Sequence, residues 1–227
     1  MGQMHTQMSV EAADGPSRIL VSDMDDARIE NVSNLLADTI AKRGIEFKTV
    51  NPGKISPEEF EKILEDFAPE GFDDVIMLVP VVPVLNGSAK TLGKDGLMNI
   101  FAGIPAGKEG EMNVKAIASN GVRYIGSSGS KTAHLRYTLD RAEAGDLQPV
   151  TALAAVGGMK SLKEGLQAVI DAKFPGKTVI FPNCPDMPLT PIDNISDLSS
   201  GIDSTLDKSG FYTLDTEKEL FKKYSVS

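Results

Sequence analysis

The sequence predicts an α/β fold built on an open, doubly wound parallel sheet, with a small C-terminal lobe. Strand-like apolar segments alternate with segments of helical periodicity along most of the chain. Val75–Val79 is apolar at every position, which is typical of a strand that helices cover on both faces. Several expected strands end in glycine or proline, where a ligand can approach the backbone closely.

The first two expected elements are a helix that begins in Met1–His5 and a buried strand, Arg18–Asp23, that ends in an acid. A helix followed by an acid-terminated strand is the order found in the second part of a dinucleotide-binding unit. Gly2 stands where the last glycine of the phosphate-binding turn would fall, and Asp23 follows 21 positions later (23 minus 2), close to the usual spacing of about 20. We therefore expect a sheet of this Rossmann type that lacks its first strand. An ordinary strand end is the alternative, because many α/β folds share this order.

Two helices and a short strand are expected next. Apolar residues recur at helical spacing through 26–43. Phe47–Val50 is typical of a short strand. Ser56 and Pro57 then supply an N-cap and a first-turn proline for a helix that should end near Phe67.

Three further strands are expected at Val75–Val79, Gly96–Gly103 and Val122–Gly126. The segment 83–92 is expected to be helical near its end, and the polar connector between the last two strands is expected to be irregular.

The C-terminal part contains fewer strong patterns. The expected elements are helix 130–144, strand 150–156, helix 161–173, strand 176–181 and helix 215–224. The composition turns polar after a cluster of prolines that ends at Pro188. The predicted division is a dinucleotide-binding domain at 1–146, a small lobe at 147–188 and an extension at 189–227.

Composition limits the classes of function. The formal net charge is −9 and the basic residues are scattered, which disfavours binding to nucleic acid or to an anionic membrane. Cys184 is the only cysteine, so no disulfide can form within the chain. No apolar run is long enough to span a bilayer. We expect a soluble cytoplasmic protein.

Several motifs in this order resemble the medium-chain, zinc-type alcohol dehydrogenase family. They are Met1–His5, Asp23 with Arg28, Asp95–Gly103, Gly126–Gly129, Gly176–Ile180 and the tail segment Gly210–Thr213. The sugar-phosphate branch, which includes L-sorbose 1-phosphate reductases, is the most similar. The resemblance covers nearly the whole chain, and it implies an oxidoreductase that transfers a hydride between a nicotinamide and a carbonyl or alcohol.

The resemblance also implies that part of the enzyme is absent. In the family an N-terminal catalytic domain carries the zinc ligands and precedes the cofactor domain, and 147–188 would be the segment that returns to it. The chain is therefore expected to be a fragment, inactive alone, with zinc only in the missing domain. Each backbone group left unpaired in the opened sheet would cost about 1–3 kcal/mol, against a typical stability of about 5–15 kcal/mol. We therefore expect either marginal stability or a sheet whose second and fourth strands move together.

On the adenosine side, the resemblance implies that Gly2, Gln3 and Met4 receive the pyrophosphate at a helix N-terminus. Asp23 would accept both ribose hydroxyls and repel a 2′-phosphate, which implies NAD rather than NADP. Arg28 could lean over the ribose. The alternatives are an unstructured chain end for the first three residues and a surface ion pair with Asp25 or Asp26 for Arg28.

On the nicotinamide side, the resemblance implies that two strand ends line the cofactor cleft and a third fixes the nicotinamide amide. The residues are Leu78, Val79 and Pro80, then Gly103 and Ile104, and finally Gly126, Ser127 and Ser128. Plain core packing and an ordinary glycine-serine turn are the alternatives. The edge strand 122–126 would pair across a two-fold axis in a homodimer.

No catalytic or metal-binding residue is predicted. His5, His134 and Cys184 each lack a second ligand at metal spacing. Two other classes of function remain open: an S-adenosylmethionine-dependent methyltransferase, which also ends its second strand in a carboxylate, and a non-catalytic binding or assembly module. The substrate cannot be read from the sequence.

Overall fold

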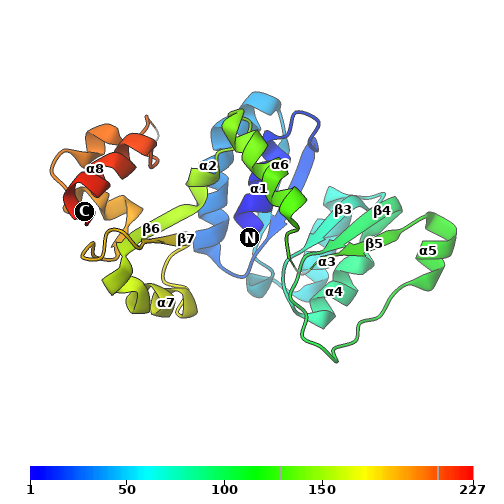
Figure 1. Cartoon of the computed structure of the whole chain (residues 1–227). Coiled ribbons are helices and arrows are strands. Elements are labelled where there is room, and N and C mark those ends of the chain that lie inside the picture. The colour runs from blue at the N-terminus through cyan, green and yellow to red at the C-terminus, as the bar shows by residue number, and fades with distance from the viewer. Residues whose placement is uncertain (128, 209, 227) are drawn as a thin grey trace. The chain divides into compact units, whose positions relative to one another are not determined.

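The computed structural model describes residues 1–127, 129–208 and 210–226 (Figure 1). The chain divides into two compact units, Met1–Ala144 and Gly145–Ser227. Each unit has parallel strand pairing and buried apolar residues of its own.

The first unit contains two parallel sheets. β1 (Arg18–Ser22) pairs with β2 (Glu46–Val50), and Arg18 lies opposite Glu46. β3 (Phe72–Met77), β4 (Leu92–Ile100) and β5 (Arg123–Gly126) form the second sheet, in that order. The predicted α/β class with parallel, Rossmann-like sheets is confirmed. Within the described residues no strand pairing joins β1 to β3.

Helices connect the strands of the first unit. They are α1 (Gly2–Glu11), α2 (Asp26–Arg43), α3 (Pro57–Phe67), α4 (Val82–Ala89), α5 (Val114–Asn120) and α6 (Thr132–Glu143). Asp25 caps α2 by accepting the N–H groups of Ala27 and Arg28. The Ser56 hydroxyl caps α3 by accepting the N–H of Glu59 at 3.1 Å, as its spacing predicted. Val10 of α1 packs with buried residues of α2, so these two helices share one apolar cluster.

β3, β4 and the connector after β4 differ from the expectation. β3 begins at Phe72 and includes two acidic residues, because its pairing with β4 supplies hydrogen bonds that the sequence pattern does not show. β4 lies at Leu92–Ile100 rather than Gly96–Gly103. The connector expected to be irregular contains α5, which Asn113 caps and Gly121 ends in a left-handed conformation.

The second unit is a three-stranded sheet with an apolar cluster on one side. β6 (Leu153–Gly158) lies between β7 (Lys177–Phe181), which is parallel to it, and the short β8 (Thr190–Pro191), which is antiparallel. β6 starts later than expected because residues Pro149–Ala152 form a 3-10 turn. The helices are α7 (Leu162–Ile170) and α8 (Leu214–Tyr224).

The tail packs into the core of this unit. Val156 and Cys184 share one buried cluster with Ile195 and Leu220. Short 3-10 segments at Ile192–Asp197 and Ile202–Thr205 carry part of that cluster. The division into three parts at residues 146 and 188 remains a prediction.

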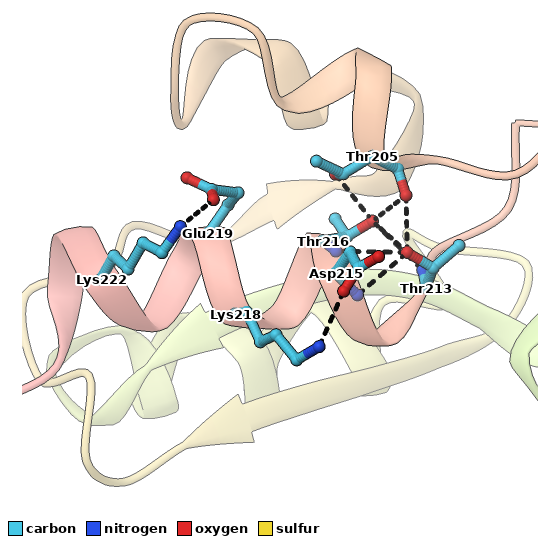
Figure 2. A network of polar contacts seen from close by, with 7 residues as sticks. All are labelled: Thr205, Thr213, Asp215, Thr216, Lys218, Glu219 and Lys222. Atoms are coloured by element: carbon cyan, nitrogen blue, oxygen red, sulfur yellow. Dashed lines mark hydrogen bonds and ion pairs between the residues drawn. The ribbon is translucent and has the colours of Figure 1, made fainter.

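A threonine network fixes the start of α8 (Figure 2). The Thr213 hydroxyl accepts the N–H groups of Asp215 and Thr216, each at 3.2 Å. The fully buried Thr216 hydroxyl donates to the Thr205 carbonyl at 3.0 Å and accepts the N–H of Thr213 at 3.2 Å. Side-chain oxygens thus satisfy the backbone groups that a helix start leaves unpaired.

None of the helices in the described part of the chain combines the length and the apolar character needed to cross a membrane.

Candidate functional site

The candidate site lies at the carboxyl ends of the parallel strands in the first unit. β1 ends at Ser22 and is followed by Asp23, β3 is followed by Leu78, and β4 is followed by Phe101. In open parallel sheets, ligands bind outside this edge at the point where the strand order reverses.

Asp23 is held at the end of β1 by two hydrogen bonds. Its N–H donates to the Val50 carbonyl at 3.3 Å, which extends the β1–β2 ladder. Its Oδ1 accepts the N–H of Asp25 at 3.0 Å. The side chain is half-buried, so its carboxylate is held by the turn into α2 and still reaches the surface.

Asn51, which no sequence pattern singled out, supports this turn. The Asn51 side-chain amide donates to the Met24 carbonyl at 3.1 Å and to Oδ1 of Asp26 at 2.8 Å. Lys54 forms an ion pair with the same carboxylate. The hydrogen bond from Lys54 has the larger effect in lowering the pKa of Asp26, and the hydrogen bond from Asn51 lowers it further. The only sequence signal is the position of Asn51 directly after β2, at the same sheet edge as Asp23.

The Arg28 side chain forms an ion pair with Asp25, the N-cap residue of the same helix, α2. Its Nε lies 3.4 Å from Oδ2 of Asp25, and both side chains are about half exposed. This is the surface ion pair considered as the alternative to a ribose contact. A pair this exposed contributes at most about 1 kcal/mol, so the guanidinium can exchange it for a ligand at little cost.

The first turn of α1 lies at the same edge. A Cβ added to Gly2 would sit 3.8 Å from Cδ1 of Leu78, an ordinary contact, so packing alone does not require glycine there. The Asn31 amide of α2 donates to Oε1 of Gln3 at 3.4 Å. No side chain caps α1 at Met1, and the N-terminal end of a helix is a favourable position for an anion.

His5 joins α1 to the end of β4. Its ring meets the Phe101 ring edge-on, with the centroids 5.4 Å apart. Burial lowers the pKa of His5, which favours the neutral imidazole. In the described ranges, no three His, Cys, Asp or Glu side chains are grouped so that they could hold a metal ion.

The residues expected to line the nicotinamide side of the cleft differ in their exposure to solvent. Val79 and Pro80 are exposed, and Val79 retains 49% of its accessible surface. Gly103 is also exposed, whereas Ile104 packs against the apolar cluster of β3 and β4. The alternative interpretation, that a residue only packs in the core, therefore fits Ile104 better than it fits Val79, Pro80 or Gly103.

The end of β5 has fewer free backbone groups for a contact with the nicotinamide than the sequence led us to expect. The Ser127 N–H donates to the Ile100 carbonyl at 3.2 Å, so this N–H is already engaged within the sheet. A Cβ added to Gly126 would lie 3.3 Å from the same carbonyl oxygen. Ser128 lies outside the described residues.

No protein-family model matches the chain. The chain is 32% identical over 223 residues to the mannitol-1-phosphate 5-dehydrogenase of Aliivibrio fischeri (strain ATCC 700601 / ES114), a match that covers 93% of the chain and 52% of that protein. It is 27% identical over 129 residues to the L-sorbose 1-phosphate reductase of Klebsiella pneumoniae, covering 56% of the chain and 31% of that protein. The chain thus spans about half the length of the first relative and about a third of the second.

Solved structures show the same fold. The 2R,3R-butanediol dehydrogenase of Bacillus subtilis matches with a TM-score of 0.58 at 18% identity, over 77% of this chain and 47% of that one. A zinc-binding dehydrogenase from Sinorhizobium meliloti 1021, solved with NADP bound, matches with a TM-score of 0.57 at 16% identity, over 80% of this chain and 50% of that one. At such identities the likeness establishes the fold alone.

Proposed function

We propose that this chain is the cofactor-binding portion of an NAD-dependent alcohol, polyol or sugar-phosphate dehydrogenase of the medium-chain family. The observation that carries the proposal is the position of Asp23 at the carboxyl end of β1, at the sheet edge where α1 also begins. The similarity to a mannitol-1-phosphate dehydrogenase over 93% of the chain supports the same class.

In this proposal the chain binds and orients the dinucleotide. The first turn of α1, at Gly2, Gln3 and Met4, would hold the pyrophosphate, and Asp23 would accept the ribose hydroxyls. A carboxylate at this position repels a 2′-phosphate, which favours NAD over NADP. Arg28 would leave Asp25 and cover the ribose.

The other strand ends would line the nicotinamide half of the cleft. Exposed Val79, Pro80 and Gly103 offer surface for this contact, and Ile104 supports them from the core. Gly126 and Ser127 would lie nearest the nicotinamide amide. The Ser127 N–H donates to the Ile100 carbonyl and its hydroxyl donates to the Gly129 carbonyl, so a contact with the amide would have to replace one of these bonds.

The chemistry would require a region that carries zinc ligands, as in the family that the chain resembles. A nicotinamide held by this chain would supply hydride transfer with an alcohol or carbonyl, and a zinc ion held by ligands of the catalytic region would supply polarisation of the substrate oxygen. The chain is then inactive alone, as a fragment of the longer dehydrogenase. We place the protein in the cytoplasm, with a polyol or sugar phosphate as substrate.

We further propose a homodimer formed through β5. This strand is the last of its sheet, and Ile125 on it retains 51% of its accessible surface. Arg123 turns back and donates to the Asp95 carbonyl at 3.1 Å, so its charge is not directed along the edge.

Calorimetric titration with NADH, NAD and NADP tests the cofactor proposal. We expect saturable binding of NADH and NAD, and weaker binding of NADP. Asp23→Ala should weaken NADH binding at least tenfold, because each hydrogen bond to a charged group contributes about 1.5–3 kcal/mol.

Asp38→Ala is the matched control, since it removes an exposed carboxylate from the middle of α2. Equal loss of affinity in both variants would mean that only the overall charge matters. A well-folded chain that binds none of the three nucleotides would exclude the cofactor role.

A further inference from the structure

α5 is weakly anchored to the rest of the first unit. Every one of its residues is at least partly exposed, and Val114 retains 71% of its accessible surface. The helix has seven residues, and isolated helices shorter than about 12–15 residues are marginal in water. The last turn of α5 should therefore open at a small fraction of the free energy of global unfolding.

The end of α5 is formed by an asparagine followed by a glycine. Asn120 is the last helical residue, and Gly121 ends the helix with a positive φ of 70°. The Ala116 carbonyl accepts the N–H of Gly121, and helix ends fray, so loss of this turn releases the Gly121 nitrogen. The Asn120 side chain is exposed, and among the described residues its amide has no hydrogen-bond partner.

An asparagine directly before a glycine can react with the backbone. The nitrogen of the glycine attacks the side-chain carbonyl carbon, and glycine permits this attack best because it has no Cβ and adopts many φ and ψ values. The sequence contains two such pairs, Asn86–Gly87 and Asn120–Gly121. Because the attack requires the backbone to leave the helical conformation, the local structure decides which pair reacts.

The first of these pairs is protected by its surroundings. Asn86 and Gly87 lie inside α4. Leu85 and Ala89 of the same helix are buried in the apolar cluster of β3 and β4. The Asn86 Oδ1 also accepts the N–H of Glu111 at 3.0 Å, so its side-chain amide is held in place. Attack by the Gly87 nitrogen would have to break both the anchored helix and this hydrogen bond.

We propose that Asn120 is a site of spontaneous deamidation in the folded protein. The Gly121 nitrogen loses its proton to solvent and forms a bond with Cγ of Asn120, while the Cγ–Nδ2 bond breaks and Nδ2 takes up a proton and leaves as ammonia. One water molecule then opens the resulting succinimide ring at either carbonyl, which leaves an aspartate or an isoaspartate. Water is the only co-reactant, and nothing is oxidised or reduced.

The product places a negative charge where the structure disfavours one. The C-terminal end of a helix carries a partial negative charge, so a carboxylate at residue 120 destabilises α5. The Asp95 carboxylate already lies against Gly121, since a Cβ on that glycine would be 2.3 Å from Oδ1 of Asp95. A second carboxylate on the neighbouring residue adds like-charge repulsion. Deamidation therefore loosens α5 and the turn that leads into β5.

Peptide mapping by mass spectrometry tests the site on the full chain, incubated in mildly alkaline buffer without nucleotide. We expect Asn120 to deamidate about tenfold faster than Asn86 or more, because the rate follows the population of the locally open form. The same incubation in concentrated urea is the control. There the two pairs should react at similar rates, because neither helix remains.

Two substitutions separate the reaction from its consequence. Asn120→Gln keeps a neutral amide but would have to form a larger ring, which closes more slowly, so it should abolish the modification and leave amide hydrogen exchange in α5 unchanged. Asn120→Asp supplies the charge of the product. It should accelerate amide exchange in α5 by about two- to fivefold, as expected for an unfavourable charge at a helix C-terminus.

Three results would count against the proposal. Equal rates at Asn86 and Asn120 in the folded chain would overturn the selection of Asn120 by the structure. An Asn120 that reacts in urea and stays intact in native buffer would mean that α5 protects it. Unchanged amide exchange in Asn120→Asp would overturn the loosening of α5. None of these measurements involves a nucleotide, so this proposal and the cofactor proposal fail separately.

Discussion

Thr216 illustrates, at the scale of one residue, why a polar side chain can be fully buried in this protein. Its hydroxyl accepts from the Thr213 N–H and from the Thr205 hydroxyl, and it donates to the Thr205 carbonyl (Figure 2). All its hydrogen-bonding capacity is used within one turn of α8 and the segment that precedes it. Burial without these partners would cost about 1–3 kcal/mol.

Thr216→Val should therefore destabilise the second unit by about 1–3 kcal/mol, although the side chain keeps its shape. The substitution leaves the Thr213 N–H without this acceptor in a partly buried position. Urea denaturation followed by circular dichroism measures the change. Ser204→Ala is the control, because its hydroxyl makes a single exposed bond to the Gly201 carbonyl at 2.7 Å. A Thr216→Val variant no less stable than Ser204→Ala would contradict this account of the network.

The residues of the candidate site differ in how far the sequence could predict them. Asp23 could be proposed from the sequence because its distance from Gly2 along the chain is a local property of one helix and one strand. Asn51 and Lys54 were missed, since their contacts with the turn after β1 depend on the pairing of β1 with β2. The roles of the predicted cofactor-binding residues remain predictions until a ligand is measured.

At the scale of the elements, local signals predicted helices better than strands. α2 occupies the predicted range, because its periodicity and both of its caps lie within the same stretch of sequence. β4 was misplaced by several residues, since it contains Lys94 and Asp95, and Asp95 adopts a positive φ of 60° that no local pattern indicates. α5 was missed because seven residues give too little periodicity to detect.

The close approach of β6 to the loop that carries Cys184 makes another prediction. A Cβ on Gly158 would lie 1.9 Å from the Cys184 carbonyl oxygen, and that oxygen belongs to backbone that cannot rotate away. Gly158→Ala should cost about 1–3 kcal/mol or more. Thermal unfolding provides the measurement.

Gly165→Ala is the matched control within the same unit. Its nearest neighbour would be Cδ1 of Ile180 at 3.4 Å, and the position lies inside α7, where alanine is favoured over glycine by about 1 kcal/mol. We expect no loss of stability there. Equal loss in both variants would show that the second unit tolerates no added methyl group, rather than that β6 and the loop are in close contact.

At the scale of the whole molecule, the buried residues form clusters that stay within one unit or the other. Val32 and Leu36 belong to a cluster of the first unit, and Cys184 belongs to the cluster of the second. Regions with separate cores can open at different free energies. Cys184 is fully buried and is the only thiol, so its labelling reports opening of the second unit specifically.

Leu36→Ala should destabilise the first unit by about 2–5 kcal/mol, because it removes a buried side chain from the cluster shared by α1 and α2. If the two cores are energetically separate, the rate at which a thiol reagent labels Cys184 in native buffer should not change. Gly158→Ala should accelerate the same reaction by tenfold or more, in line with its expected cost. Faster labelling in the Leu36→Ala variant would instead mean that the chain opens as one cooperative unit, and that a weakness in the open sheet of the first unit is transmitted to the second.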